Sequence, residues 1–371
     1  MKRPQNMPLA GLTSLFVILA LIATACGNGS STDTAATTTS DAPSTIAFED
    51  SGISTTTAQQ FEVVSVAARN SIETSPLWIA DSRGLFAKYG IEIRYLPVSD
   101  EGAVVGSMIS DEARIGMLSA TAVVEGLRSL PGDLFEPLVY VSGTDIRADS
   151  GRGAMSLVAA SGKTITSGCD LVGQSVAVRG FITTPAIAVR EMVRNDGCDP
   201  AEVTLVVSNA EQTLNRLAQG EVAAAATLDP LTAQALRSSN SVIANLDAEL
   251  CPGYGVCPLS LAVVDIDWAT NNPELAEGFR RAMHEAISWI RVNEIDYRAE
   301  LVQCCSVDVN DATETAIPNF VGVGRSLDSD LARLQDVVSA QLEARRASND
   351  ADAQDDVTTD TSVDTDTEAD S

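Results

Sequence analysis

Residues 75–98 read SPLWIADSRGLFAKYGIEIRYLPV, and this stretch carries the signals of a helix, a turn and a strand in succession. Ser75 is a favourable N-cap, and Pro76 suits the first helical position because no backbone N–H is needed there. Gly84 breaks the helix, and Gly90 can take the left-handed conformation that ends one. The residues after Gly90 alternate apolar and polar side chains, which predicts a strand. The helix N-terminus at Ser75 is also a place for a ligand.

The same alternation of strands and helices runs along the chain from residue 61 to residue 267, which predicts an α/β fold with mostly parallel sheets. The expected strands are 61–67, 91–96, 115–118, 137–141, 155–159, 175–178, 203–207, 222–227 and 259–264. The expected helices are 76–83, 101–110, 121–129, 184–195, 210–219, 230–238, 273–292 and about 327–346.

The order of these blocks predicts two lobes, because the chain crosses into a second lobe and then returns. We expect the first lobe at 61–160 and 260–346, and the second lobe at 161–259. Ligands of such α/β lobes bind at the carboxyl ends of strands, against helix N-termini. The sequence therefore predicts a ligand cleft between the lobes.

The 371 residues include 51 acidic and 24 basic side chains, which gives a net charge of −27. Nucleic acid is a poor partner for such a surface, because phosphate binding needs clustered Lys and Arg. Residues 347–371 are rich in Asp and lack basic residues, so we expect a disordered acidic tail. Residues 26–60 are rich in Ser, Thr, Gly and Asp, which predicts a flexible tether.

The N-terminus has the features of a bacterial export signal. Lys2 and Arg3 precede an apolar run at about 9–25, and the sequence before Cys26 resembles the lipobox of lipoproteins, although Ala23 stands where Leu is usual. We expect residues 1–25 to be a signal peptide and Cys26 to carry lipid. Simple secretion is one alternative. A retained helix is another, since the run is close to membrane-spanning length.

Six further cysteines suggest disulfides in an exported chain, namely Cys169, Cys198, Cys251, Cys257, Cys304 and Cys305. Cys169 precedes the strand 175–178 and Cys198 follows the helix 184–195, so both should lie at one end of the second lobe and pair. Cys251 and Cys257 flank PGYGV, which allows a tight reversal and a second pair.

Cys304 and Cys305 form the third pair by this assignment, but a bond between sequence neighbours is strained. Cross-pairing of these two residues with Cys251 and Cys257 therefore stays open. We expect no metal site, because the chain has no CxxC pair and His284 is its only histidine.

Five blocks in order resemble the substrate-binding proteins of ABC importers for nitrate, sulfonate and taurine, an NMT1/THI5-like group. The blocks are 75–98, MISDEARIGMLSAT (108–121), DLVGQSVAVRG (170–180), LNRLAQGEVAAAATLDP (214–230) and DWATNNPELAEGFRRAMHEAISWIRVN (267–293). Arg114 stands where Asp is common, Ala224 replaces an acid, and Asp229 replaces Glu. The resemblance implies the two-lobed type 2 periplasmic-binding-protein fold with the ligand in the cleft.

The resemblance also implies the positions of ligand contacts. They are Asn70, Ser71, Ser75, Pro76, Ser119, Ala120, Thr121, Phe181, Thr183, Thr184 and Asp229. Arg179, which ends the strand 175–178, is a further candidate from the residues themselves. Ser75, Thr121 and Thr184 are each the first polar residue of a helix that follows a strand, so their hydroxyls can meet a ligand or only cap the helix. Arg179 can pair with an anionic group or remain a surface cation, and Asp229 can meet an amine or cap a helix.

These features together predict a lipid-anchored solute-binding protein on the extracytoplasmic face of the cell membrane. We expect a monomer that needs no cofactor and delivers a small anionic or zwitterionic solute to ABC permease subunits. One alternative is a cell-surface solute sensor of the same fold. An enzyme of thiamine-pyrimidine metabolism is disfavoured, because the cysteine-rich iron motif and the several histidines that it needs are absent.

The lipid anchor can be tested directly. Cys26→Ala should block processing and lipidation, because the acylated thiol is lost. Metabolic labelling with a palmitate analogue measures this. Equal label in the wild type and the variant would show that Cys26 is not the lipidated residue.

Overall fold

The structure is a computed structural model that describes residues 61–127, 134–143, 153–250, 258–305, 307–321 and 331–343. The expected signal peptide, Cys26, the tether, the acidic tail and the Cys251–Cys257 pair lie outside these residues. Within the described ranges, no helix is long and apolar enough to span a membrane.

The opening stretch folds as its sequence predicts. Helix α1 covers Ser75–Ser82, a short helix α2 covers Leu85–Lys88, and strand β2 covers Ile91–Pro97. Gly84 has φ of 66° and Gly90 has φ of 72°, so both glycines take the left-handed conformation at the two turns. The chain therefore reverses twice within a few residues after α1 and brings β2 back to pair with β1 in the sheet.

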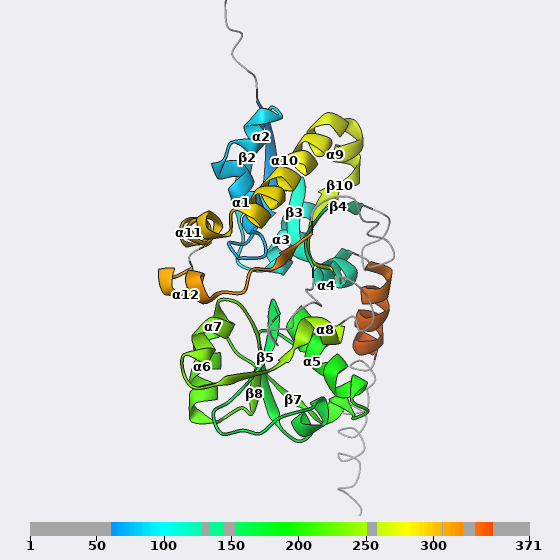
Figure 1. The fold of residues 1–371 in the computed structure, drawn as a ribbon. Coiled ribbons are helices and arrows are strands. Elements are labelled where there is room, and N and C mark those ends of the chain that lie inside the picture. Colours follow the sequence, from blue (N-terminus) through cyan, green and yellow to red (C-terminus); the bar gives the residue numbers. More distant parts are fainter. Residues whose placement is uncertain are drawn as a thin grey trace, which may run out of the picture. The chain divides into compact units, whose positions relative to one another are not determined.

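The first sheet has the strand order β11-β4-β10-β3-β1-β2. The strands other than β2 are β1 (Glu62–Ala68), β3 (Ile115–Ser119), β4 (Phe135–Gly143), β10 (Pro258–Asp265) and β11 (Asn319–Phe320). In Figure 1 they run from blue and cyan through yellow to orange, which shows that distant parts of the chain share this sheet. Strand β1 is parallel to β2 and β3, whereas β10 is antiparallel to β3 and β4.

The second sheet has the order β7-β6-β8-β5-β9 and is drawn in green in Figure 1. Its strands are β5 (Met155–Ala159), β6 (Ser175–Val178), β7 (Thr204–Val207), β8 (Ala224–Leu228) and β9 (Ser241–Asn245). Strand β5 pairs antiparallel with β8 and β9. The expected lobe boundary at residue 160 is therefore too late, because this pairing places β5 in the second sheet and the first sheet is left after β4.

The expectation of mostly parallel sheets is also wrong. Four strand pairs are parallel and five are antiparallel among the described residues. The antiparallel pairs all involve β5, β10 or β11. The chain enters the second sheet with β5 and returns to the first sheet with β10, and β11 is added later at the edge beside β4. Entering strands run opposite to the strands of the local βαβ units, and residue periodicity does not record strand direction.

Helices surround both sheets. The remaining α-helices are α3 (Glu101–Ile109), α4 (Ala120–Ala122), α5 (Thr184–Asn195), α6 (Ala210–Gln219), α7 (Leu231–Leu236), α8 (Leu246–Leu250), α9 (Ile266–Asn271), α10 (Pro273–Val292), α11 (Glu294–Cys304) and α12 (Val309–Glu314). A π-helix covers Val123–Leu127, 3₁₀ turns cover Gly168–Leu171 and Pro200–Glu202, and residues 331–343 are helical. Residue periodicity does not predict α8, α9, α11, α12, β9 or β11, which are short or weakly amphipathic.

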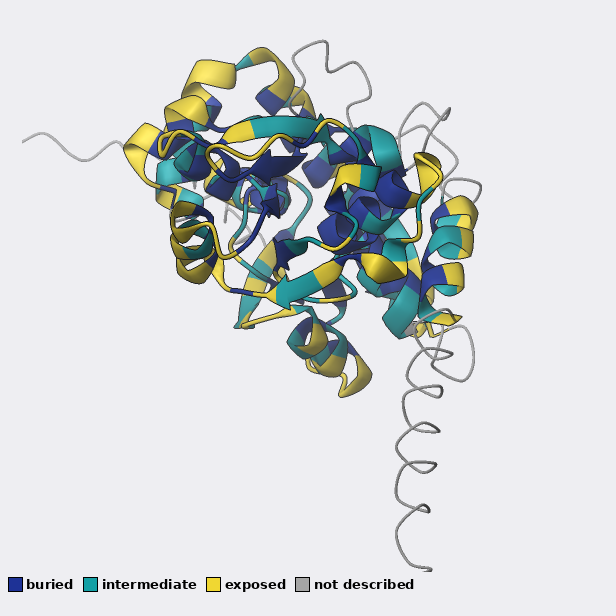
Figure 2. Cartoon of the chain, turned by 90° about the horizontal axis from the view of Figure 1, so that it is seen from below, coloured by how far each residue is buried: buried dark blue, intermediate teal, exposed yellow. Residues whose placement is uncertain are grey.

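Each lobe has its own packed interior. Val64 and Val66 of β1 are fully buried with Phe279 and Ile287 of α10 in the first lobe. In the second, β6 and β8 bury short Val and Ala side chains beneath α5. Figure 2 shows buried residues on the strands and exposed residues on the outer turns of the helices. The rigid parts of the fold are therefore the sheets and the inner helix faces, which fix the positions of the strand ends.

Two disulfides lie within the described residues. Cys169, in the 3₁₀ turn before β6, is bonded to Cys198, just after α5, with a Cα–Cα distance of 5.4 Å. The sulfur atoms of the neighbours Cys304 and Cys305 are also bonded, at the end of α11.

Peptide mapping without reduction tests the pairing, and we expect one linked peptide that holds Cys169 with Cys198. The bond closes a loop of about 30 residues, which in the chain-entropy model stabilises the fold by roughly 3.6 kcal/mol. The double variant C169A/C198A should therefore unfold at lower denaturant. A linked peptide that joins Cys169 to another cysteine would contradict the assignment, and a Cys304–Cys251 or Cys304–Cys257 peptide would favour cross-pairing.

Candidate functional site

Polar residues follow the carboxyl ends of four strands that lie near the boundary between the lobes. They follow β1 at 69–75 and β3 at 119–121 in the first lobe, and β6 at 179–184 and β8 at Asp229 in the second. Parallel strands place their carboxyl ends at one edge of a sheet, so each lobe presents a polar edge. Two of these edges meet in a chain of hydroxyl groups.

The hydroxyl chain consists of Ser119, Thr121 and Thr184 and begins at the carboxylate of Glu101. The Ser119 hydroxyl donates to Glu101 Oε2 at 2.8 Å, and the Ser119 backbone N–H donates to Oε1 at 3.0 Å. Thr121 Oγ1 lies 3.0 Å from Ser119 Oγ and 2.9 Å from Thr184 Oγ1. Thr121 is 1% exposed and Thr184 is 7% exposed. Since Thr121 follows β3 and Thr184 begins α5, this last contact joins the two lobes directly.

Sequence reasoning missed Glu101 and its partner Arg69. Glu101 is the first residue of α3, whose N-cap Asp100 accepts from the backbone N–H of Ala103 at 2.9 Å. Arg69, just after β1, donates to Glu101 Oε1 at 3.2 Å. The signal was present in the sequence, because an acid at the start of a helix that follows a strand lies at the same sheet edge as Ser119.

Thr184 does not cap its helix. Thr183 is the N-cap residue of α5, and its hydroxyl donates to the carbonyl of Gly180 at 3.0 Å, so no side chain caps the helix. The backbone N–H of Ile187 bonds to the carbonyl of Thr183 at 3.0 Å. The Thr184 hydroxyl is therefore used in the contact with Thr121, at the positive end of a helix of 12 residues.

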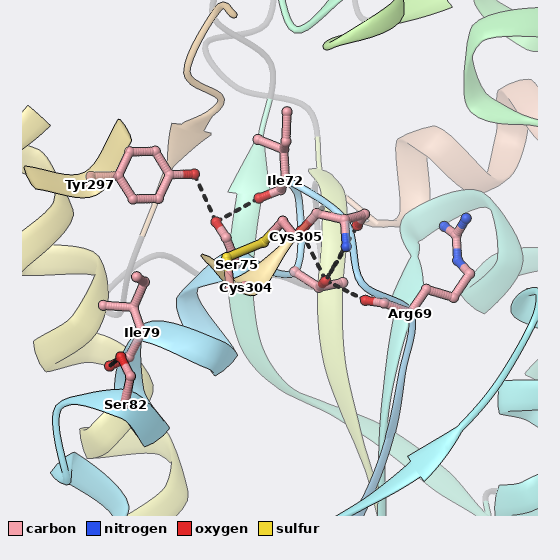
Figure 3. Close-up of a disulfide and its surroundings, with 10 residues drawn as sticks. Arg69, Ile72, Ser75, Ile79, Ser82, Tyr297, Cys304 and Cys305 are labelled. Atoms are coloured by element: carbon pink, nitrogen blue, oxygen red, sulfur yellow. Dashed lines mark hydrogen bonds between the residues drawn. A yellow bond between two sulfur atoms is a disulfide. The ribbon is translucent and has the colours of Figure 1, made fainter. Parts of the chain in front are cut away.

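The expected N-cap at Ser75 is wrong, because Ser75 is the first helical residue and Thr74 precedes it. The Ser75 hydroxyl donates to the carbonyl of Ile72 at 2.7 Å and lies 2.7 Å from the Tyr297 hydroxyl of α11. Figure 3 shows Tyr297 pointing at Ser75. Both residues are fully buried, and burial raises the pKa of Tyr297. The Ser75 side chain thus fixes α1 against α11 within the first lobe.

The other residues expected near Ser75 lie in different surroundings. Asn70 is exposed, and Ser71 Oγ lies 3.3 Å from Thr74 Oγ1. Thr74 Oγ1 donates to the carbonyl of Arg69 at 2.6 Å, so the side chains of Ser71 and Thr74 form their hydrogen bonds within this loop. Pro76 is buried in α1. The structure brings none of these side chains into the hydroxyl chain.

Three further expected residues flank the hydroxyl chain. Ala120 is fully buried between Ser119 and Thr121. Arg179 follows β6, is exposed, and has no hydrogen bond or ion pair among the described residues. Phe181 is 39% exposed and lines a small pocket with Ile187 of α5 and Val338 of the helical residues 331–343.

Asp229 takes part in a second contact between the lobes. Its Oδ1 accepts from the backbone N–H of Ala233 at 3.2 Å, which caps α7, and its Oδ2 accepts from Ala316 N–H at 3.1 Å. On the same helix, Gln234 donates to the buried Asp311 of α12 at 2.6 Å, and Arg237 pairs with the same carboxylate. The Asp229 carboxylate therefore has a structural function at this contact.

The described residues offer no group of three or more His, Cys, Asp or Glu side chains that could hold a metal ion. What the hydroxyl chain can do is form hydrogen bonds between two rigid lobes.

Comparison with known proteins gives a consistent result. A sequence profile described as the NMT1-like family matches residues 61–306. No curated protein sequence matches the chain. Among solved structures, the periplasmic aliphatic sulphonate-binding protein SsuA from Escherichia coli superposes with a TM-score of 0.61 at 15% identity, over 76% of this chain and 88% of that one.

Two other solved structures show the same fold. The alkanesulfonate-binding protein SsuA from Xanthomonas axonopodis, bound to MOPS, gives a TM-score of 0.59 at 13% identity, over 77% of this chain and 94% of that one. The periplasmic nitrate-binding protein NrtA from Synechocystis gives a TM-score of 0.52 at 14% identity, over 68% of this chain and 69% of that one. Both superpose on two thirds or more of this chain, which supports the two-lobed α/β fold described above.

Thr184→Ala should lower the free energy of unfolding by about 1–2 kcal/mol, because a buried hydrogen bond is lost and Thr121 is left with one partner fewer. Denaturant titration measures the change. Thr204→Ala makes the same substitution at an exposed position in the same lobe and should change the free energy of unfolding little. Equal losses of unfolding free energy in the two variants would show that the Thr121–Thr184 contact does not stabilise the fold.

Proposed function

This chain belongs to the NMT1-like family, and from that premise we propose that it is an extracytoplasmic solute-binding protein that delivers a small solute to an ABC importer. In this proposal Cys26 carries the lipid that holds the protein at the outer face of the cell membrane. Residues 26–60 are the tether, residues 347–371 are an acidic tail, and the folded part acts as a monomer. No covalent chemistry and no cofactor are involved.

The observation that carries the proposal is the Thr121–Thr184 contact at 2.9 Å. Two lobes with separate sheets place buried hydroxyl groups opposite each other, and a solute held between them would be enclosed from both sides. Solute sites are typically closed over by the surrounding protein, with a few convergent polar groups that fix orientation. The hydroxyls of Ser119, Thr121 and Thr184 are such groups.

The solute that we propose is small and anionic or zwitterionic. The N-terminus of α5 lies at the lobe boundary, where its backbone N–H groups favour a negative group. Arg179, exposed just before this helix, supplies a nearby positive charge. The similar proteins bind alkanesulfonates or nitrate by their descriptions, which supports sulfonate, nitrate or taurine-like candidates.

Delivery follows from closure of the lobes. The permease would recognise the form in which both lobes enclose the solute, because only that form brings surfaces of the two lobes into a fixed arrangement. An affinity in the micromolar range corresponds to roughly −8 kcal/mol, which a few hydrogen bonds and an apolar wall can supply. The proposal therefore needs no unusual interaction.

A thermal-shift screen of the purified chain against nitrate, sulfonates, taurine, pyrimidines and carboxylates tests the solute class, and calorimetry measures affinities for any solute that binds. Thr184→Ala should weaken binding of that solute by about 1 kcal/mol, the value of one neutral hydrogen bond. Thr204→Ala is the matched control and should bind like the wild type. Loss of affinity in neither variant, or in both, would contradict the assignment of the site.

A further inference from the structure

The proton positions in the hydroxyl chain follow from one charged group. Arg69 and the Ser119 backbone N–H both donate to Glu101 Oε1, at 3.2 Å and 3.0 Å. A glutamate paired in this way with an arginine is ionised, and an ionised carboxylate has only acceptors. The 2.8 Å contact with Glu101 Oε2 therefore uses the single proton of the Ser119 hydroxyl.

The direction of the next two hydrogen bonds is then determined. Ser119 Oγ has no proton left, so Thr121 must donate across the 3.0 Å contact between them. The Thr121 proton is thereby used, so Thr184 must donate across the 2.9 Å contact between the lobes. Every O–H bond in the chain points toward Glu101.

The groups that remain for a solute can be counted from this arrangement. Ser119 Oγ also accepts from the Ala122 backbone N–H at 3.2 Å, so both its lone pairs are occupied. Thr121 Oγ1 keeps one lone pair and Thr184 Oγ1 keeps two. Within the described hydroxyl chain, the two threonines thus present acceptors and no donor while their mutual bond is intact, and Thr121 remains an acceptor when a solute separates it from Thr184, because its proton is held by Ser119.

We infer that the solute carries a hydrogen-bond donor, most suitably an ammonium group, that binds Thr121 and Thr184, and that Glu101 sets this preference as a positioning residue. This inference rests on the proposed function, and it narrows the solute class to zwitterionic amines over simple anions. The anionic group of such a solute meets the N-terminal N–H groups of α5. The net charge of −27 also favours a zwitterion over a simple anion, because it repels the anion and leaves the neutral zwitterion unaffected at long range.

The test compares pairs of solutes that differ only in the amine. The pairs are taurine with ethanesulfonate, β-alanine with propionate, and 2-aminoethylphosphonate with ethylphosphonate. Calorimetry on the purified full chain should give the amine member of the pair that binds an affinity roughly ten-fold or more above its partner, the effect of one hydrogen bond to a charged group. Equal or tighter binding of the member without the amine overturns the inference and leaves the proposed function standing.

Glu101→Gln tests the part played by the carboxylate. A glutamine amide can donate as well as accept, so the donor and acceptor of each hydrogen bond in the hydroxyl chain are no longer fixed. The preference for the amine should then fall to about two- or three-fold. Glu112→Gln is the matched control, an exposed position just beyond the other end of α3, and should keep the full preference. An unchanged preference in Glu101→Gln overturns the role of Glu101.

The remaining outcomes are also decisive. If Glu101→Gln does not fold, the paired affinities of the wild type still decide whether the solute needs a donor. If no member of any pair binds, the inference is overturned, and the broader screen with nitrate and pyrimidines then shows whether the proposed function fails with it.

Discussion

Buried hydroxyl groups must find hydrogen-bond partners, and at the boundary between the lobes some of those partners come from the other lobe. Thr121 and Thr184 are almost completely buried, yet neither has a backbone acceptor for its side chain. Leaving such a group unpaired costs about 1–3 kcal/mol. The lobes therefore meet where their polar residues satisfy each other, and a solute that separates the two threonines has to replace the hydrogen bond that it removes.

The second contact between the lobes is of a different kind. Asp311 of α12 is buried and accepts from Gln234 of α7 and from Arg237 just after that helix, while Asp229 accepts from the backbone on both sides of the boundary. Removing one of these partners is costly, because the buried Asp311 carboxylate is then left with one hydrogen bond fewer to satisfy its charge. The contacts of Asp311 and Asp229 are therefore suited to keeping the lobes together, whereas the single neutral hydrogen bond between Thr121 and Thr184 is suited to replacement by hydrogen bonds to a solute.

The neighbouring first-lobe residues show how the site is supported from behind. The Ser75 hydroxyl, with Ile72 and Tyr297, fixes α1 to α11, and Arg69 with Glu101 links the end of β1 to the start of α3. Both links are satisfied without any solute. They hold the strand ends in place so that Ser119 and Thr121 can present their oxygens in a fixed direction, which is the property that discriminates between donors and acceptors.

The sequence by itself determined the strand–helix alternation, the turns at Gly84 and Gly90, and the helices α5, α6 and α10, because local periodicity and glycine conformation set these features. It also placed Thr121 and Thr184 at the starts of helices that follow strands, whereas Ser119 came from the family resemblance. Only the tertiary structure decided that β5 belongs to the second sheet, that Ser75 bonds to Tyr297, and that Asp229 accepts from Ala316 across the lobe boundary. Strand direction and the partner of a polar side chain depend on residues far away in the chain, and no local pattern records them. The role of Glu101 is the clearest case, since its charge acts on Thr184 only through two hydroxyls from another part of the fold.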